Sequence, residues 1–171
     1  MIYDKSLTVC LTGHRPGKLP WHYDETKENC YRFKNDLRLV LEGAIKYGLK
    51  FFLTGMAEGF DMIATEILLE LKSTYNDIKI VAVIPCLGQE KNWKQSQQEK
   101  YNEILNNCDD KIILSKIYTK KCMNDRNKFM VNHASVVIAC YNGRPSGTGN
   151  TIRLAKENRY KIKIINPDDY K

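Results

Sequence analysis

Toward its C-terminal end the chain reads Ala134-Ser135-Val136-Val137-Ile138-Ala139-Cys140, followed by Gly143-Arg144-Pro145-Ser146-Gly147-Thr148-Gly149. The first stretch is a short apolar run, which predicts a buried β-strand. The second is a glycine-rich turn, which predicts the start of a helix. A turn of this kind directs backbone N–H groups and a helix N-terminus toward one point. The two stretches therefore predict a strand–turn–helix unit with a site for a phosphate or another anion.

Two further glycine loops follow apolar runs in the same way. Thr12-Gly13-His14-Arg15-Pro16 follows the run at 7–11, and Thr54-Gly55-Met56-Ala57-Glu58-Gly59 follows the run at 50–54. In an open parallel sheet the carboxyl ends of the strands share one edge, where ligands bind. We therefore expect the three loops to meet there and to hold a ligand of nucleotide size.

Apolar runs alternate with helical patterns along the whole chain, which is typical of an α/β fold. Strands are expected at 7–11, 50–54, 78–85, 111–115, 135–140 and 161–165, and helices at 27–47, 60–73, 91–106, 123–132 and 149–158. The run at 78–85 is apolar at nearly every position, as in a strand covered on both faces. We predict one doubly wound Rossmann-like domain over residues 1–171, with a mostly parallel central sheet flanked by helices.

Two features of this pattern can be checked directly. The inner face of the first long helix is predicted to consist of Cys30, Phe33, Leu37, Val40, Ala44 and Tyr47. The segment 16–26 is the one long irregular connection, and loops of that length often close over a site.

Composition narrows the classes of protein. The chain has 171 residues and a formal net charge of +7 from 27 basic and 20 acidic residues. The basic residues are scattered, so direct nucleic-acid binding is disfavoured. No apolar run is long enough to cross a membrane, and residues 1–6 lack the pattern of a signal peptide. We expect a cytoplasmic protein with no membrane partner.

Several site classes are absent from the sequence. The six cysteines form no C-x-x-C pair and no cluster with metal-ligand spacing, so we expect reduced thiols and no metal. Cys10 and Cys140 fall inside strand patterns, where a cysteine is usually a core residue. Neither a P-loop, a complete G-x-G-x-x-G nor a G-x-S-x-G is present. We expect no cofactor, and structural roles for His22 and His133.

The expected ligand-binding residues come from the three loops and from the helix predicted at 123–132. Arg126 on that helix is either a surface arginine or a phosphate ligand, and its place just before the strand at 135–140 favours the second. Asp61 either caps the next helix, which we favour, or holds a ribose hydroxyl. The full set is Gly13, His14, Arg15, Gly55, Gly59, Asp61, Arg126, Gly143, Ser146, Gly147, Thr148 and Gly149.

Taken in order, these motifs resemble the SLOG superfamily, which contains the Lonely Guy cytokinin-activating proteins and DNA-processing protein A. The similarity is strongest to its YpsA-like branch, in which Thr-Gly-His-Arg-Pro and Gly-Met-Ala-x-Gly-x-Asp loops occur. Lonely Guy enzymes carry M-x-x-R-K-x-x-M and P-G-G-x-G-T-x-x-E and release the base from nucleoside 5′-monophosphates. This chain keeps Met123, Arg126 and Met130, but it has Asn127 for the lysine and Thr151 for the catalytic glutamate.

The departure from the Lonely Guy motif at Thr151 favours a binding module over an enzyme. A threonine hydroxyl cannot replace the carboxylate that stabilises positive charge on the ribose. We therefore favour binding of a nucleotide or nucleotide-derived small molecule as a sensor or regulator, and YpsA-like proteins are associated with cell division and stress. The first alternative is an N-glycosidic hydrolase in which Glu58 or Asp61 is catalytic, with Arg126 assisting. The second is single-stranded DNA binding. Dimers are common in the superfamily, which makes a homodimer a further expectation.

Overall fold

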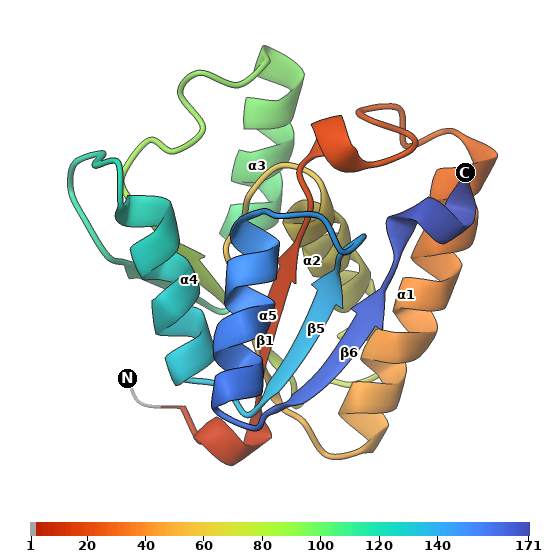
Figure 1. Ribbon diagram of the computed structural model, residues 1–171, viewed down its shortest axis with the longest axis vertical. Coiled ribbons are helices and arrows are strands. Elements are labelled where there is room, and N and C mark those ends of the chain that lie inside the picture. The colour runs from red at the N-terminus through yellow and green to blue at the C-terminus, as the bar shows by residue number, and fades with distance from the viewer. Residues whose placement is uncertain (1–2) are drawn as a thin grey trace.

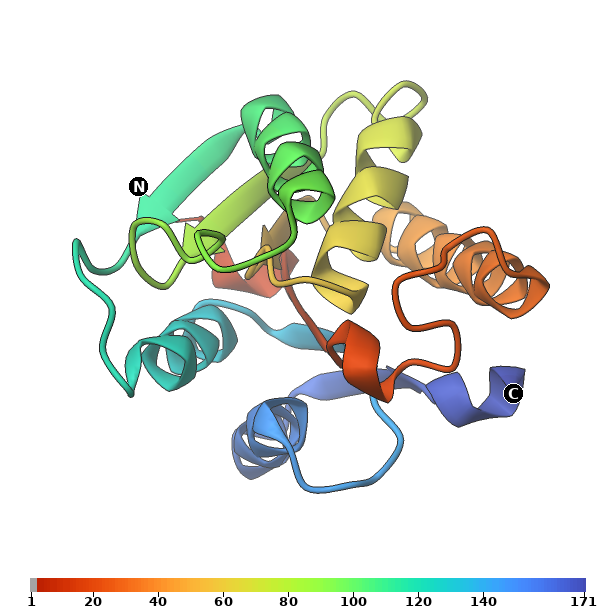
Figure 2. The ribbon, with the colours of Figure 1, turned by 90° about the horizontal axis from the view of Figure 1, so that it is seen from above.

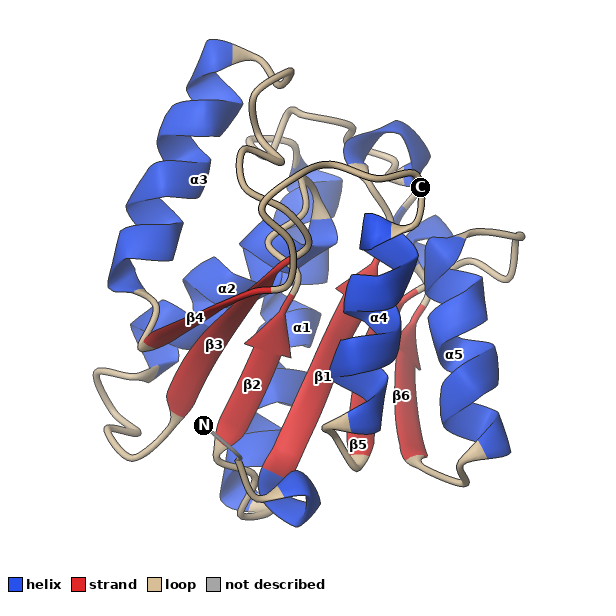
Figure 3. Ribbon diagram, turned by 90° about the vertical axis from the view of Figure 1, so that its left-hand side faces the viewer, coloured by secondary structure: helices blue, strands red, loops and turns tan. Residues whose placement is uncertain are grey.

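One parallel sheet forms the centre of the protein. Among residues 3–171, which the computed structural model describes, the sheet has six strands in the order β4-β3-β2-β1-β5-β6 (Figure 3). The strands are β1 (Thr8–Gly13), β2 (Phe51–Thr54), β3 (Lys79–Ile84), β4 (Asp110–Ile113), β5 (Val136–Cys140) and β6 (Lys161–Ile165). Every neighbouring pair is parallel. The predicted α/β class is confirmed, and the carboxyl ends of the strands share one edge.

Helices cover both faces of the sheet. They are α1 (Glu28–Lys46), α2 (Phe60–Leu71), α3 (Gln95–Asn107), α4 (Cys122–Asn132) and α5 (Gly147–Glu157). The helices α4 and α5 lie side by side on one face (Figure 1), and α1, α2 and α3 lie on the other (Figure 2). Short 3₁₀ turns occur at Lys5–Leu7, Pro16–Lys18 and Pro167–Tyr170. Within residues 3–171, no helix is long and apolar enough to span a membrane.

The order of the strands creates a crevice at one place on the sheet. From β1 the chain winds outward through β2, β3 and β4, and it then crosses back to place β5 on the other side of β1. The last residues of β1 and β5 are in register, with Gly13 opposite Cys140. The chain leads from β1 to α1 on one face of the sheet and from β5 to α5 on the other face (Figure 2). Such a switch point is the usual place of a ligand site in an open parallel sheet.

The predicted elements are confirmed in type, although some details differ. The helix expected from residue 91 begins at Gln95, because the residues before it form turns. In α1 the expected inner face is wrong toward its C-terminal end, where Leu41 and Ile45 are buried and Tyr47 is 71% exposed. After Leu37 the buried positions recur every fourth residue, as one face of a helix requires.

The long connection at 16–26 is anchored in the core. Leu19 and Trp21 are buried, and the Trp21 ring packs on Phe33 of α1 with their centroids 4.8 Å apart. Burial of two such side chains holds the segment firmly against the domain. Only the first turn of this segment is therefore placed to close over a ligand, because Gly17 and Lys18 line the crevice.

Candidate functional site

A cleft of about 610 Å³ lies at the carboxyl ends of β1 and β5. Its walls are the loop after β1, the turn at Pro16–Lys18, the loop after β2 with the first turn of α2, the first half of α4 and the first turn of α5. Pockets for small molecules and cofactors commonly enclose about 300–1,000 Å³. The cleft therefore has room for a ligand of nucleotide size at the place that the sequence predicted.

Most of the predicted ligand-binding residues meet at this cleft. Those that line it are Gly13, His14, Arg15, Asp61, Arg126, Ser146, Gly147 and Thr148. The remaining candidates lie outside its lining, and they are Gly55, Glu58, Gly59, Gly143 and Gly149. For two of these glycines the structure gives a packing role, described below.

Arg126 is a buried cation on the wall of the cleft. Only 5% of the residue is exposed, its Nη1 donates to the carbonyl oxygen of Gly55 at 2.6 Å, and its Nε donates to Asn127 Oδ1 at 2.8 Å. A Cβ on Gly55 would lie 2.0 Å from Nη1, so the glycine leaves space for the guanidinium. Burial lowers the pKa of Arg126, and the Asp61 carboxylate opposes that shift. An arginine remains protonated in such surroundings, so the cleft has a fixed positive charge.

Asp61 is a buried carboxylate in the first turn of α2. Its Oδ2 accepts from the backbone N–H of Ala57 at 3.2 Å, and the capping position is occupied by Gly59. The predicted capping role of Asp61 is therefore wrong, because its side chain turns back to order the preceding loop. Burial raises the pKa of Asp61, and the guanidinium of Arg126 opposes the shift.

Gly59 is required by the backbone at the start of α2. Its φ is +89°, and a Cβ there would lie 2.7 Å from the carbonyl oxygen of His14. The N–H of Phe60 donates to the same oxygen at 3.2 Å. The loops after β1 and β2 are thereby locked together, which explains this glycine without a ligand.

His14 connects the loops that follow β1 and β5. The residue is 2% exposed, and its Nε2 lies 2.8 Å from Asn142 Oδ1 and 3.2 Å from the backbone nitrogen of Asn142. When Nε2 is protonated it donates to Oδ1, and when it is not it accepts from the Asn142 N–H. The ring also packs on Tyr141 with centroids 5.5 Å apart. Burial lowers the pKa of His14, which favours the neutral imidazole. The residue borders the cleft and also joins its two sides.

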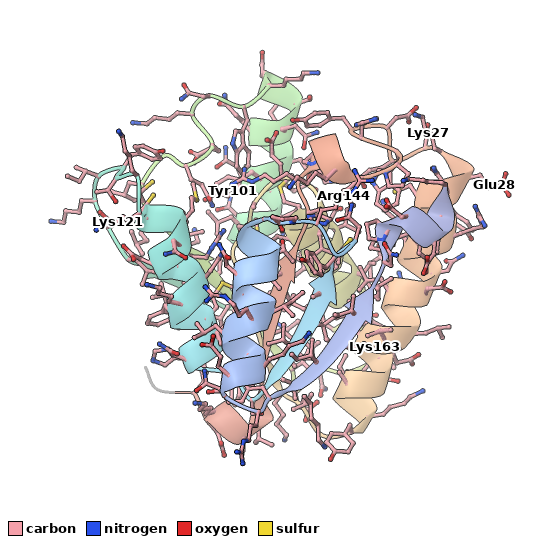
Figure 4. All side chains as sticks on the ribbon, viewed as in Figure 1. Lys27, Glu28, Tyr101, Lys121, Arg144 and Lys163 are labelled. Atoms are coloured by element: carbon pink, nitrogen blue, oxygen red, sulfur yellow. The ribbon has the colours of Figure 1, made fainter. Side chains whose placement is uncertain are left out.

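The first turn of α5 presents hydrogen-bond donors to the cleft. Ser146 caps this helix, because its Oγ accepts from the N–H of Gly149 at 3.1 Å. The amides of Gly147 and Thr148 precede the first intrahelical bonds, and both residues line the cleft. Arg144 lies on the loop just before this turn (Figure 4). The turn has the features of a helix N-terminus that binds an anion.

Positive charge predominates in the cleft. Its lining includes Arg15, Lys18 and Arg126, against the single carboxylate of Asp61. The Nζ of Lys18 donates to the carbonyl oxygen of Pro145 at 3.3 Å, so its ammonium reaches across to the loop before α5. Three cations around a helix N-terminus favour an anionic ligand.

Two residues that bear on catalysis lie outside the cleft lining, namely Thr151, which takes the place of the Lonely Guy glutamate, and the catalytic candidate Glu58. The hydroxyl of Thr151 donates to the carbonyl oxygen of Gly147 at 3.0 Å, within α5. Glu58 is 8% exposed, and its Oε2 accepts from the Tyr23 hydroxyl at 3.5 Å. Burial raises the pKa of Glu58, while the nearby Arg15 opposes the shift. Neither side chain is part of the cleft lining.

Comparison with known proteins assigns the family. The model named YpsA, described as the YspA SLOG family, matches residues 9–170. The chain belongs to this SLOG family. A UPF0398 protein of Bacillus thuringiensis (strain Al Hakam) is 26% identical over 158 residues, which cover 91% of this chain and 85% of the relative. The SPbeta prophage-derived protein YoqJ of Bacillus subtilis (strain 168) is 30% identical over 152 residues, which cover 80% of this chain and 89% of the relative.

Solved structures of DNA processing protein A share the fold of this SLOG chain. The protein from Streptococcus pneumoniae aligns with a TM-score of 0.62 at 19% identity, over 94% of this chain and 50% of that one. The protein from Helicobacter pylori, whose single-stranded DNA binding mode has been described, aligns with a TM-score of 0.62 at 20% identity, over 94% of this chain and 66% of that one. The SLOG chain thus spans half to two thirds of these proteins.

Some residues that line the cleft of this SLOG chain were not among the predicted ligand-binding residues. Lys18 and Ala57 line it, as do Met123 and Asn127. Lys18 lies in an irregular segment, where no periodic pattern shows which side chains point inward. Asn127 could have been found from the M-x-x-R-K-x-x-M comparison, in which it takes the place of the lysine beside Arg126.

Proposed function

We propose that the protein binds a nucleotide or a nucleotide-derived small molecule in this cleft, without turnover, as a sensor or regulatory module. The observation that carries the proposal is the convergence of Arg15, Lys18 and the buried Arg126 on the first turn of α5. A fixed guanidinium and free helix amides provide the charge and the directed donors that phosphate oxygens accept from.

The geometry suggests how such a ligand lies. Its phosphate occupies the space before the amides of Gly147 and Thr148, where Arg15 and Lys18 reach it from the loop after β1. Asp61 lies on the same cleft and can accept a hydrogen bond from a ribose hydroxyl. The base then extends toward the open side of the cleft.

The positions of the carboxylates support binding rather than hydrolysis. Cleavage of an N-glycosidic bond develops positive charge on the ribose, which a carboxylate stabilises. Thr151 has no such group, Glu58 lies off the cleft, and Asp61 is held by the N–H of Ala57. A hydrolase would depend on Asp61, so Asp61→Asn would abolish release of free base. A binding module would release no base with either side chain.

The direct test is a thermal-shift screen with chromatography of each mixture after incubation. The panel contains nucleoside mono-, di- and triphosphates, NAD, ADP-ribose and cyclic nucleotides. We expect at least one compound to raise the melting temperature and to be recovered intact. Arg15→Ala should weaken that binding about tenfold, since a hydrogen bond to a charged group contributes about 1.5–3 kcal/mol. The matched control is Arg153→Ala, on the outer face of α5 with its side chain 74% exposed.

Any of three results would contradict the proposal. If no compound shifts the melting temperature, the cleft is not a nucleotide site. If Arg15→Ala and Arg153→Ala bind the same ligand equally well, the ligand lies elsewhere. Free base in the chromatogram would instead identify a hydrolase.

Single-stranded DNA binding is a second candidate, and one surface favours it. The segment Lys116-Ile117-Tyr118-Thr119-Lys120-Lys121 is exposed throughout, and Tyr118 is 68% exposed. It precedes α4 at the same end of the molecule as Arg144, as the position of Lys121 shows (Figure 4). Lysines beside an exposed aromatic ring suit a nucleic-acid strand, whose bases stack on such rings.

This candidate has its own assay. Fluorescence anisotropy with a labelled oligothymidylate should show binding that weakens steeply as the salt concentration rises. Tyr118→Ala should reduce that affinity and leave mononucleotide binding unchanged. If the oligonucleotide binds no better than a mononucleotide, the exposed segment is not part of a DNA site.

A further inference from the structure

Two buried cysteines lie in contact next to the cleft. Cys86 follows β3, and Cys122 is the first residue of α4. Their sulfur atoms are 4.0 Å apart, and the residues are 1% and 3% exposed. Both are free thiols in this structure. A disulfide requires the two sulfur atoms to approach to about 2.05 Å, so a movement of about 2 Å would join them.

Each cysteine lies on a segment that contacts the carbonyl group of Gly55. Three residues after Cys86, the side chain of Gln89 donates from Nε2 to the Gly55 oxygen at 3.4 Å. One helical turn after Cys122, Arg126 donates from Nη1 to the same oxygen at 2.6 Å. A bond between the two sulfur atoms would therefore shift both side chains that donate to the Gly55 oxygen, Gln89 and Arg126. Arg126 is the fixed cation of the cleft.

We propose that Cys86 and Cys122 form a reversible disulfide, with a hydroperoxide as the oxidant, and that this bond weakens ligand binding in the cleft. The sulfur of Cys122, as a thiolate, attacks one peroxide oxygen of H₂O₂. The O–O bond breaks, hydroxide is the leaving group, and Cys122 becomes a sulfenic acid. The sulfur of Cys86 then attacks the sulfenic sulfur, the S–O bond breaks, and water leaves. Two thiols lose two electrons and two protons, and the peroxide is reduced to two waters.

The roles of the two thiols follow from their positions. Cys122 is the first residue of α4 and precedes Met123, which lines the cleft, so a peroxide in the cleft meets this thiol first. Burial raises the pKa of the Cys86 thiol, which favours its protonated form. Disulfides of cytosolic proteins are usually transient and redox-sensing, and a pair beside a ligand site fits that use.

The bond would change the cleft by moving α4. Drawing its first turn toward the segment after β3 shifts Met123 and Arg126, which both line the cleft. The guanidinium of Arg126 packs so closely on Gly55 that it cannot follow this movement and keep its hydrogen bond to the Gly55 oxygen. The effect on the ligand rests on the proposed function, whereas the disulfide itself does not.

The experiment uses the full chain, treated with excess H₂O₂ and then freed of it. Mass spectrometry of peptides without reduction should find the peptides of Cys86 and Cys122 joined, with the loss of two hydrogens, and dithiothreitol should reverse it. Cys122→Ser should lack the link. Cys108→Ser should keep it, because Cys108 is a half-buried thiol at the end of α3 outside the pair. Circular dichroism checks that both variants are folded.

The second measurement is AMP binding together with hydrogen exchange of residues 122–132. Oxidation should weaken AMP binding about tenfold, as expected when one charge-assisted hydrogen bond is lost, and should alter exchange in α4. Oxidised Cys122→Ser should show neither effect.

The outcomes separate the two proposals. Failure to join these two peptides, or unchanged exchange in α4 after they join, overturns the switch whatever AMP does. Unchanged AMP affinity in the joined protein overturns its effect on the site. If AMP binds neither form while the link forms and alters α4, AMP binding is refuted and the thiol pair stands as a redox site.

Discussion

Gly55→Ala tests whether the loop after β2 is built around Arg126. An added Cβ would lie 2.0 Å from Arg126 Nη1 and 2.4 Å from Cζ, well inside van der Waals contact. The φ of Gly55 lies outside the left-handed region, so alanine introduces no backbone strain. The substitution therefore changes only the space that the Arg126 guanidinium occupies.

The expected cost follows from the bond that the methyl group breaks. The guanidinium must move by more than 1 Å, which separates Nη1 from the Gly55 oxygen that it now contacts at 2.6 Å. Loss of a buried hydrogen bond to a charged group costs about 1.5–3 kcal/mol. In a domain of this size each kcal/mol lowers the melting temperature by about 2–4 °C, which gives a decrease of roughly 3–12 °C.

Urea unfolding measures this cost, and a double-mutant cycle assigns it. In an Arg126→Ala background the space for the methyl group is already open, so Gly55→Ala should there be nearly neutral. The difference between the two backgrounds is the coupling energy of the pair. Gly43→Ala is the matched control, because a Cβ at this α1 position meets nothing within 4 Å. It should stabilise the protein by about 0.5–1 kcal/mol.

Two results would refute this reasoning. A Gly55→Ala protein that unfolds at the same urea concentration as the parent would mean that the Arg126 guanidinium does not pack against Gly55. An equal cost in both backgrounds would mean that the methyl group disturbs the loop itself.

Three further predictions concern the surroundings of the cleft. Burial lowers the pKa of His14 below 6.5, so the unfolded state binds the proton more tightly, and stability should fall as the pH drops from 6.5 through the lower pKa of the folded state. His14→Gln should flatten that part of the urea-stability profile, and an unchanged dependence on pH would contradict this assignment. Trp21→Ala should cost about 3–5 kcal/mol in urea unfolding because its ring is fully buried. Tyr23→Ala, on the same segment but 44% exposed, should cost under about 1 kcal/mol, and equal costs would contradict the anchoring role. Ser146→Ala should cost about 1 kcal/mol through loss of the α5 cap, while Ser146→Gly should cost only a few tenths; a Ser146→Ala protein as stable as the parent would exclude the cap.

The cleft illustrates how far spacing along the chain can predict a site. Gly13, Gly55 and Gly59 were expected to be among the ligand-binding residues, and the loops that carry them do meet at one edge of the sheet. The structure gives their lack of side chains another cause, because added Cβ atoms would meet Phe60, Arg126 and the His14 carbonyl oxygen. A glycine shows that something approaches the backbone closely, and the sequence does not say whether that is ligand or protein.

By itself the sequence determined the order and type of the elements, the parallel sheet and the edge at which the loops meet. These follow from local periodicity and from the connections that βαβ units permit, so they can be read along the chain. Only the tertiary structure decided that Arg126 is buried on Gly55, that Asp61 turns back to Ala57, and that Cys86 lies against Cys122. Each of these contacts joins segments whose side-chain directions depend on how the helices pack on the sheet, and no local pattern records that packing.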